Sequence, residues 1–246
     1  TTSVTDAACF NTPTGAATAT PGGTGTSYTF MWSDDALNLI GNAASVSGLP
    51  AGTYGVLVMD NNSCQTVATV TISEPTLLSA SATATMVTCF GDSDGDATAT
   101  GMGGTTPYSF VWSNDSTDAM ITGLMAGVYT TTVTDNNSCM AMASVTVTEP
   151  AQVVSTVVAT DISCNGLTDG MVSVSSVGGT SPYTYAWDNG LGNVSSATGL
   201  TANTYSVTTT DANGCTAGVA SGVVTEPTAL TASITATNDT VCFGAT

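Results

Sequence analysis

Residues 124–150 read LMAGVYTTTVTDNNSCMAMASVTVTEP, and this stretch decides the fold. Thr and Val alternate on both sides of residues 135–138, and a period of two places successive side chains on opposite faces of a strand. The four central residues, Asp-Asn-Asn-Ser, are typical of a tight turn because Asn and Asp tolerate positive φ. The stretch therefore predicts a β-hairpin, and its β-branched residues disfavour a helix.

Closely related stretches occur twice more in the chain. Each ends in Glu-Pro, and the three glutamates are the only ones among the 246 residues. The pairs are Glu74-Pro75, Glu149-Pro150 and Glu226-Pro227. A sequence that resets about every 75 residues is built of stacked units. We expect three repeats at 1–75, 76–150 and 151–227, with 228–246 as the first strand of a following repeat.

The last segment alternates in the same way, with Leu230 and Ile234 on one face. A single strand cannot bury such a face alone, so we expect it to need a partner sheet. Two interpretations are open. The chain is a window of a longer array, or it is a pilus-like subunit that donates its last strand to a neighbour.

Two aromatic motifs recur in each unit. One is a strand with alternating aromatic residues that ends in Trp32, Trp112 or Trp187, which predicts a core position for each tryptophan. The other, Leu-x-x-Gly-x-Tyr, resembles the tyrosine corner of Ig-like sandwiches and carries Tyr54, Tyr129 and Tyr205. In the third unit Asn203 replaces the glycine, and we expect it to occupy a left-handed site.

With six or seven short strands per unit, these motifs predict an all-β fold: tandem Ig-like antiparallel β-sandwich repeats that form a rod or filament.

The joint pattern resembles the SprB-type repeat of large secreted adhesins from gliding bacteria. All three units carry it. In the third it rests on Cys164-Asn165-Gly166, Asp169-Gly170, the segment 178–187, the corner 200–205, the turn 211–215 and the closing Glu226-Pro227. The first unit departs from it where Asn11 stands in place of the glycine after the opening cysteine. The resemblance implies a cell-surface or filament-borne array used for adhesion or for movement over surfaces, with neighbouring repeats or identical subunits as partners.

Composition excludes several classes of function. The chain has no Lys, Arg or His and a formal charge of −18. Without basic residues we expect no binding to nucleic acid and no attraction to anionic membranes, and no apolar run reaches the ~20 residues of a membrane span. Without His or Lys there is no Ser-His-Asp triad and no Schiff base, so we expect no enzyme.

The sequence therefore predicts a non-catalytic extracellular protein, a structural or adhesive segment of a filament or stalk. The alternative is a glycan-binding surface module, in which Trp and Tyr side chains would stack against surface glycans.

The seven cysteines fall into two classes. Four open the units and three follow the hairpin turn, a regularity that indicates disulfides in an oxidising compartment. We predict pairing within each repeat: Cys9–Cys64, Cys89–Cys139 and Cys164–Cys215, with Cys242 left over. Spacing leaves open the links across repeats, which are Cys64–Cys89, Cys139–Cys164 and Cys215–Cys242. In a simple Ig topology the first strand's end and the last hairpin lie at opposite poles, which argues against the first scheme.

Two kinds of surface site complete the predictions. The alternating carboxylates of Asp92, Asp94 and Asp96 resemble the start of a calcium loop, against the alternative of an ordinary acidic turn, and no other cofactor is expected. Asparagines that begin Asn-x-Ser/Thr, and two hydroxyls in short Asp-Ser/Thr-apolar motifs, predict glycosylation. These candidates are Asn61, Asn114, Asn136, Asn193, Asn238, Ser116 and Thr240.

Overall fold

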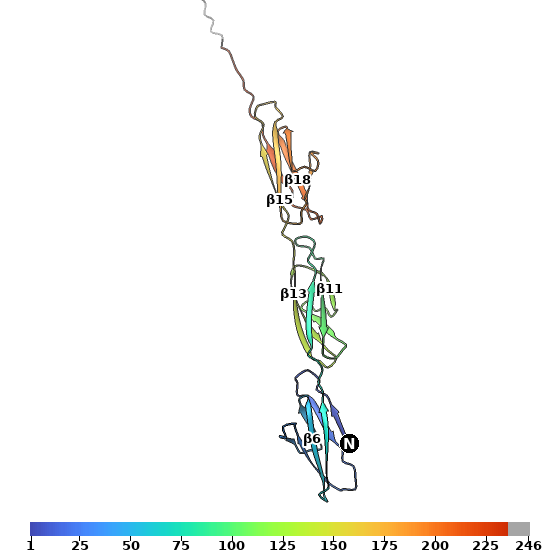
Figure 1. Cartoon of the computed structure of the whole chain (residues 1–246). Helices are drawn as coiled ribbons and strands as arrows, with labels where there is room; N and C mark the ends of the chain where they lie inside the picture. The colour runs from blue at the N-terminus through green and yellow to red at the C-terminus, as the bar shows by residue number, and fades with distance from the viewer. Residues whose placement is uncertain (236–246) are drawn as a thin grey trace, which may run out of the picture. The chain divides into compact units, whose positions relative to one another are not determined.

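The computed structural model describes residues 1–235, and every helix or strand assigned in that range is a β-strand (Figure 1). The all-β fold predicted from the two-residue periodicity is therefore confirmed. The same part of the chain contains no helix that could cross a membrane.

The first sandwich comprises a three-stranded sheet in the order β1-β2-β5 and a four-stranded sheet in the order β4-β3-β6-β7. All pairings are antiparallel, and β6 and β7 form the hairpin. The strands are β1 (Thr2–Thr5), β2 (Gly15–Ala19), β3 (Tyr28–Ser33), β4 (Leu39–Gly41), β5 (Ser45–Leu49), β6 (Gly52–Asp60) and β7 (Gln65–Ile72).

The other two sandwiches repeat this plan with six strands each. The second has sheets β11-β9-β8 and β10-β12-β13, and the third has β14-β15-β17 and β16-β18-β19. The second is built of β8 (Ser79–Ala84), β9 (Gly95–Met102), β10 (Ser109–Trp112), β11 (Met120–Leu124), β12 (Gly127–Thr134) and β13 (Met140–Val147). The third is built of β14 (Val154–Thr160), β15 (Gly170–Val177), β16 (Thr184–Trp187), β17 (Ser196–Leu200), β18 (Asn203–Thr210) and β19 (Ala220–Val224).

Each sandwich has its own apolar core around one tryptophan. Trp32, Trp112 and Trp187 are 0%, 2% and 7% exposed. Each indole Nε1 donates a hydrogen bond to a backbone carbonyl 2.9–3.0 Å away, so the polar atom of each buried ring is satisfied. These tryptophans are core residues and present no exposed aromatic platform.

The tyrosine corner is present in all three sandwiches. The hydroxyl of Tyr54 donates to Pro50 O at 2.8 Å, and those of Tyr129 and Tyr205 donate to the carbonyl four residues earlier at 3.1 Å. Each bond fixes the start of the strand that leads into the hairpin. The expected backbone bond of these hydroxyls is therefore confirmed.

The left-handed residue of the corner lies earlier than predicted. Asn203 begins β18 and has no positive φ; instead Gly199 has φ 78°, as Gly48 and Gly123 have 72° and 71°. At these glycines the pairing register shifts by one residue, which is a β-bulge in β5, β11 and β17. The prediction for Asn203 is wrong because the extra residue of the bulge, and not the corner, requires the left-handed conformation.

The chain divides into two compact units. Unit 1 holds residues 1–87 and 91–148, and unit 2 holds residues 88–90 together with the chain from 149 onward. Residues 228–235 carry no regular element, and the side chains of Leu230 and Ile234 are exposed. The rest of the predicted extra strand, with Asn238, Thr240 and Cys242, lies outside the described residues.

Candidate functional site

Two disulfides mark the candidate site, and neither has the predicted partner. Cys9 bonds Cys139, with 5.7 Å between the Cα atoms, and Cys89 bonds Cys215, with 5.6 Å. Neither bond crosses between the two compact units: Cys9 and Cys139 both belong to unit 1, and Cys89 and Cys215 both belong to unit 2. Pairing within a repeat is therefore wrong for these cysteines. The alternative links Cys64–Cys89, Cys139–Cys164 and Cys215–Cys242 are wrong as well, because Cys89, Cys139 and Cys215 are bonded elsewhere. Cys64 and Cys164 are exposed and unpaired.

The rule that the two bonds share is simple. In each, the cysteine that opens one repeat bonds the hairpin cysteine of the following repeat. We call residues 8–11, 88–91 and 163–166 the opening loops, and residues 60–64, 135–139 and 211–215 the hairpin turns.

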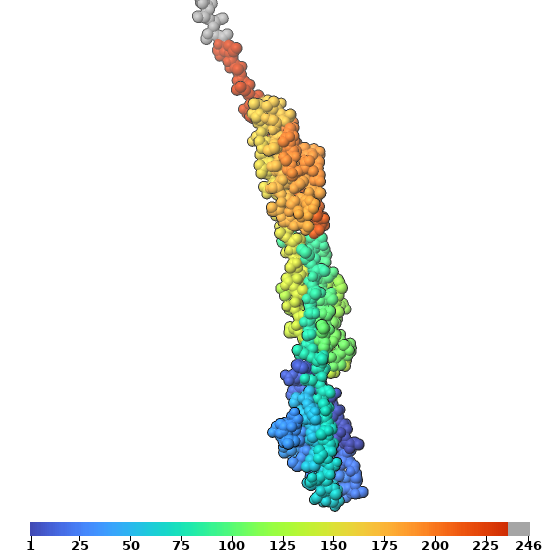
Figure 2. Space-filling model, viewed as in Figure 1, coloured from blue at the N-terminus to red at the C-terminus, as the bar shows by residue number. Residues whose placement is uncertain are grey.

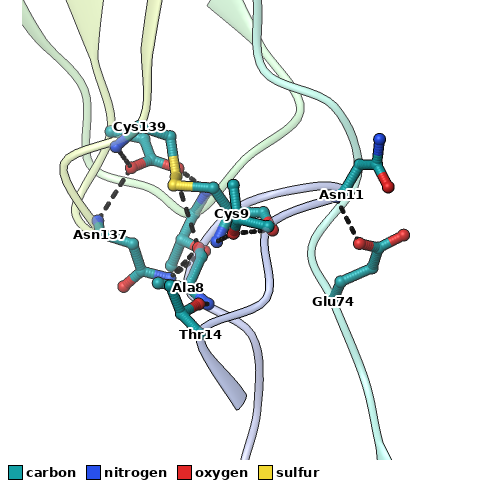
Figure 3. Close-up of a disulfide and its surroundings, with 10 residues drawn as sticks. Ala8, Cys9, Asn11, Thr14, Glu74, Asn137 and Cys139 are labelled. Carbon is teal, nitrogen blue, oxygen red and sulfur yellow. Dashed lines mark hydrogen bonds between the residues drawn. A yellow bond between two sulfur atoms is a disulfide. The ribbon is translucent and has the colours of Figure 1, made fainter. Parts of the chain in front are cut away.

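The first opening loop is held by the end of its own repeat (Figure 3). Ala7 N donates to Ser73 O at 2.9 Å, and Asn11 N donates to the carboxylate of Glu74. On the other side of the loop, Ala8 N donates to Thr14 Oγ1 at 2.7 Å. Asn11 has φ 54°, so it adopts the left-handed turn that glycine adopts elsewhere in the chain.

The third opening loop has the same supports. Gly166, with φ 87°, donates its N–H to the carboxylate of Glu226, and Asn165 Nδ2 donates to Pro227 O at 3.1 Å. Ser163 N donates to Asp169 Oδ1 at 3.1 Å. The closing glutamate thus fixes the opening loop, a role that sequence reasoning missed. The sequence did contain a signal for this role, because glutamate occurs only at the three repeat ends.

This arrangement explains why Cys9 cannot reach Cys64. The opening loop is tied to Ser73 and Glu74, just beyond one end of β7, whereas Cys64 precedes the other end of that eight-residue strand. Such a strand spans roughly 26 Å. A disulfide needs Cα atoms within about 7 Å, so pairing within the first repeat is excluded by geometry.

The hairpin turn presents the second cysteine on a rigid frame. Asp135 is 5% exposed, and its Oδ1 accepts the N–H groups of Asn137 and Cys139, each at 2.9 Å. Its Oδ2 accepts Thr105 N at 2.8 Å. Burial raises the pKa of this carboxyl, but the hydrogen bonds from Thr105, Cys139 and Asn137 outweigh it and lower the pKa below the ordinary 3.8.

The bond to Thr105 also explains the recurring Gly-Gly-Thr. Gly104 has φ 60°, and a Cβ placed there would lie 2.5 Å from Asp135 Oδ2, so the loop can reach the carboxylate only without a side chain at this position. The third sandwich repeats the frame, with Asp211 accepting Asn213 N, Cys215 N and Thr180 N at 2.7–2.9 Å. The hydrogen bond from Thr180 is the main cause that lowers the Asp211 pKa.

The left-handed residue of the predicted hairpin turns is their fourth. It is Ser63 at φ 63° and Ser138 at 68° in the first two sandwiches, and Gly214 at 89° in the third. The predicted hairpins are present, between β6 and β7, β12 and β13, and β18 and β19.

Loop and turn meet at the first disulfide. Asn137 Nδ2 donates to Ala8 O at 2.9 Å and to Thr105 Oγ1 at 3.1 Å, and Cys139 Sγ lies 3.3 Å from Ala8 O (Figure 3). Figure 2 shows the dark blue N-terminal segment against the second sandwich of unit 1. In unit 2, Cys215 Sγ lies 3.5 Å from Thr88 O, the same contact one repeat later. The junction is therefore a repeated structure with a covalent bond at its centre.

The other predicted sites are dispersed. Among residues 1–235, no group of three or more His, Cys, Asp or Glu side chains is arranged to hold a metal ion. Asp96 lies in β9, which begins at Gly95, and its backbone is hydrogen-bonded to Thr85, whereas Asp92 and Asp94 precede the strand; calcium binding at these three carboxylates stays a prediction. The exposed glycosylation candidates are Asn61, Asn114, Asn136 and Asn193, with Ser116 half-buried.

The SprB repeat family model matches residues 1–37, 81–117 and 156–192. These segments contain the opening loops and the buried tryptophans but none of the hairpin cysteines. No curated protein matches the chain in sequence.

Several solved structures align with the chain at low similarity. The mouse nectin-like molecule 4 ectodomain is 10% identical, with 83% of this chain and 92% of that chain covered and a TM-score of 0.36. A tetra-tandem repeat from the extending region of a large adhesion protein is 17% identical, with 91% and 74% covered and a TM-score of 0.26. Fibronectin(III)-like modules of Clostridium thermocellum CbhA are 10% identical, with 61% and 95% covered and a TM-score of 0.29.

Proposed function

The chain carries three matches to the SprB repeat, and we propose that it is a non-catalytic stalk segment of an extracellular adhesin. In this proposal the repeats occupy 1–75, 76–150 and 151–227, and the sequence from 228 onward corresponds to the start of a further repeat. Its role is to hold an adhesive end away from a cell surface and to transmit force along the array. Its partners are other repeats of the same kind.

One observation carries this proposal: each disulfide joins the opening loop of one repeat to the hairpin turn of the next. A bond inside a sandwich would stabilise that sandwich alone. A bond between sequence repeats restrains the link from one sandwich to the next, which is what a load-bearing array requires. Disulfides of this kind persist in oxidising surroundings, which supports an extracellular location.

The glycan-binding alternative has lost its main support. It required tryptophans on the surface, and Trp32, Trp112 and Trp187 are buried in the cores. Strand donation retains one supporting observation, the exposed Leu230 and Ile234 in a segment that aligns with the paired strands β8 and β14.

Small-angle X-ray scattering of the oxidised chain tests the proposal. A stalk of three sandwiches, each about 40 Å long, has a radius of gyration of roughly 35 Å, whereas a compact chain of this length has about 18 Å. We expect the larger value, and reduction should broaden the distribution of distances because the junctions loosen. A radius near the compact value, or saturable binding of the chain to a glycan, would contradict a stalk.

A further inference from the structure

The first sandwich carries an apolar hollow that the stalk role does not use. It has a volume of about 490 Å³, within the range of ligand sites, and it opens on the outer face of the sheet β4-β3-β6-β7, whose strand β6 is labelled in Figure 1. We propose that this hollow binds an extended segment of another protein, which offers an apolar side chain flanked by lysine or arginine. The inference goes beyond the proposed function and does not depend on it.

The floor of the hollow is a row of apolar side chains across three paired strands. Met31, Leu57 and Val67 lie opposite one another in the register of β3, β6 and β7. Their chain neighbours Trp32 and Val56 belong to the core, so the row faces outward. Met31 and Val67 are more than half exposed. A partner that covers this row removes apolar surface from water, which favours binding.

The other two sandwiches lack this floor. They carry hydroxyl residues at two positions of the central strand, namely Thr132 and Thr208 in place of Leu57, and Thr130 and Ser206 in place of Gly55. Gly55 has no positive φ, and a Cβ placed there would have only Ser33 Oγ nearby, in ordinary contact at 3.6 Å. Neither backbone conformation nor packing therefore requires the glycine, and its effect is to keep the hollow open.

A longer loop forms the wall of the hollow. The chain from Trp32 to Gly48 is four to five residues longer than the corresponding segments 112–123 and 187–199, and it contains β4, which the other sandwiches lack. Leu37 in this loop is 84% exposed. Asn38 donates its N–H and its side-chain amide to the two carboxylate oxygens of Asp34, at 2.8 and 2.9 Å. Insertions in repeat proteins often mark the binding face, and a loop held in this way needs little ordering on binding.

Neighbouring repeats leave this face open. The corresponding row of the second sandwich contains Val111 and Met142, and both are exposed although a disulfide ties that sandwich to the preceding repeat. All residues that line the hollow fall between 31 and 69, inside unit 1, which also contains the following repeat. The exposure of the row is therefore a property of the first sandwich itself.

Charge indicates which partner fits. Asp34 and Asp35 line the hollow beside its apolar floor. The hydrogen bond from the Asn38 side chain is the main cause that lowers the pKa of Asp34, so this carboxylate is ionised at neutral pH. A second copy of this chain has no Lys, Arg or His to offer and carries the same charge of −18. An apolar side chain with a cation beside it complements both features of the hollow, so the occupant is a different protein.

Titration of the oxidised, ¹⁵N-labelled chain with short peptides, followed by NMR, tests the inference. The probe is the acetylated and amidated pentapeptide Arg-Thr-Leu-Thr-Arg, in which an extended conformation places Leu and both Arg on one face, about 7 Å apart. One control peptide has Glu in place of each Arg, and the other has Ser in place of Leu. Salt at about 0.15 M screens the carboxylates that lie far from the hollow.

We expect saturable shifts of the Gly55 and Leu57 amides with a Kd of about 1 mM or lower, and binding of each control peptide that is weaker by about tenfold or more. Gly55→Thr fills the hollow with the residue of the second sandwich and should weaken binding by about tenfold, and Leu57→Thr should do the same. The matched control Ser206→Thr in the third sandwich should bind as the unchanged chain does. The amide spectrum of each variant shows that it is folded.

Equal binding of the Glu peptide would contradict a basic partner, and equal binding of the Ser peptide would reduce the contact to charge attraction alone. The inference is also overturned if about 10 mM probe causes no saturable shift at the hollow. Shifts at the hollow that depend on the concentration of the chain, without peptide, would identify a second copy as the occupant instead. None of these outcomes changes the scattering of the unbound chain, so the stalk proposal is judged separately.

Discussion

At the scale of single residues, the second sandwich buries a threonine at a position where the other two sandwiches bury a valine. Thr131 is 1% exposed, and its Oγ1 has no hydrogen-bond partner. The corresponding residues two positions after the corner tyrosine are Val56 and Val207, both fully buried. The hydroxyl therefore loses its water on folding without compensation, whereas a methyl group at this position would not.

We expect Thr131→Val to stabilise the second sandwich by about 1–2 kcal/mol, the cost of one unsatisfied buried hydroxyl. Urea unfolding measures the change, followed by hydrogen exchange on β12 and β13 so that this sandwich is observed by itself. Val207→Thr is the matched control and should destabilise the third sandwich by a similar amount. A loss of stability in Thr131→Val would mean that the hydroxyl has a partner.

At the scale of structural elements, the hairpin turns depend on ionised carboxylates. Asp135 and Asp211 accept three backbone N–H groups each, and their pKa values lie below the ordinary 3.8. A carboxyl whose pKa is lower in the folded state than in the unfolded state stabilises the fold at pH values above its ordinary, unfolded-state pKa. That contribution is lost as the pH falls through the folded pKa.

The unfolding temperature should therefore be nearly constant from about pH 7 to pH 5 and should fall below about pH 4, where unfolded carboxyls begin to bind protons. Asp211→Asn should lower the unfolding temperature at neutral pH and flatten the acid decline. Asp211 accepts Thr180 N–H through Oδ2 and the N–H groups of Asn213 and Cys215 through Oδ1, whereas an amide has one accepting oxygen and must leave one side of this frame unpaired. Circular dichroism melts at each pH give the comparison. An unchanged acid slope in this variant would assign the decline to other carboxyls.

The elements also show what the sequence could predict. The hairpins and the tyrosine corners were predictable because their causes are local: turn-forming residues between alternating strands, and a hydroxyl four residues from its carbonyl acceptor. The bulge glycines were not, because the extra residue is defined by the register of a partner strand far away in sequence. The disulfide partners were missed for a related reason: Cys9 and Cys139 are 130 residues apart, and spacing within one repeat carries no information about the next repeat.

At the scale of the whole molecule, the two disulfides interlock. Cys89 lies inside the loop closed by Cys9 and Cys139, and Cys139 lies inside the loop closed by Cys89 and Cys215. The segment from 89 to 139 therefore belongs to both loops. Force applied to the two ends of the chain reaches this segment through both bonds, so unfolding cannot release most of the backbone.

This topology sets the length to which the chain can be pulled. The shortest covalent path runs from residue 1 to Cys9, across to Cys139, back to Cys89, across to Cys215 and on to the end. It contains about 90 residues and extends to roughly 310 Å, against roughly 850 Å for the reduced chain. Single-molecule pulling through handles at both ends, with and without reductant, measures both lengths.

Pairing within repeats would give the fully oxidised chain a covalent path of the same length, so that length alone does not distinguish the two schemes. Single cysteine substitutions do distinguish them. With the observed bonds, Cys139→Ser leaves a path of about 120 residues, or roughly 420 Å, because the remaining bond still bypasses the chain between Cys89 and Cys215. Cys64→Ser should leave the oxidised length unchanged, since Cys64 takes part in neither bond. A longer path in Cys64→Ser would show that Cys64 is bonded within the chain and would overturn the interlocked arrangement on which load transmission between repeats depends.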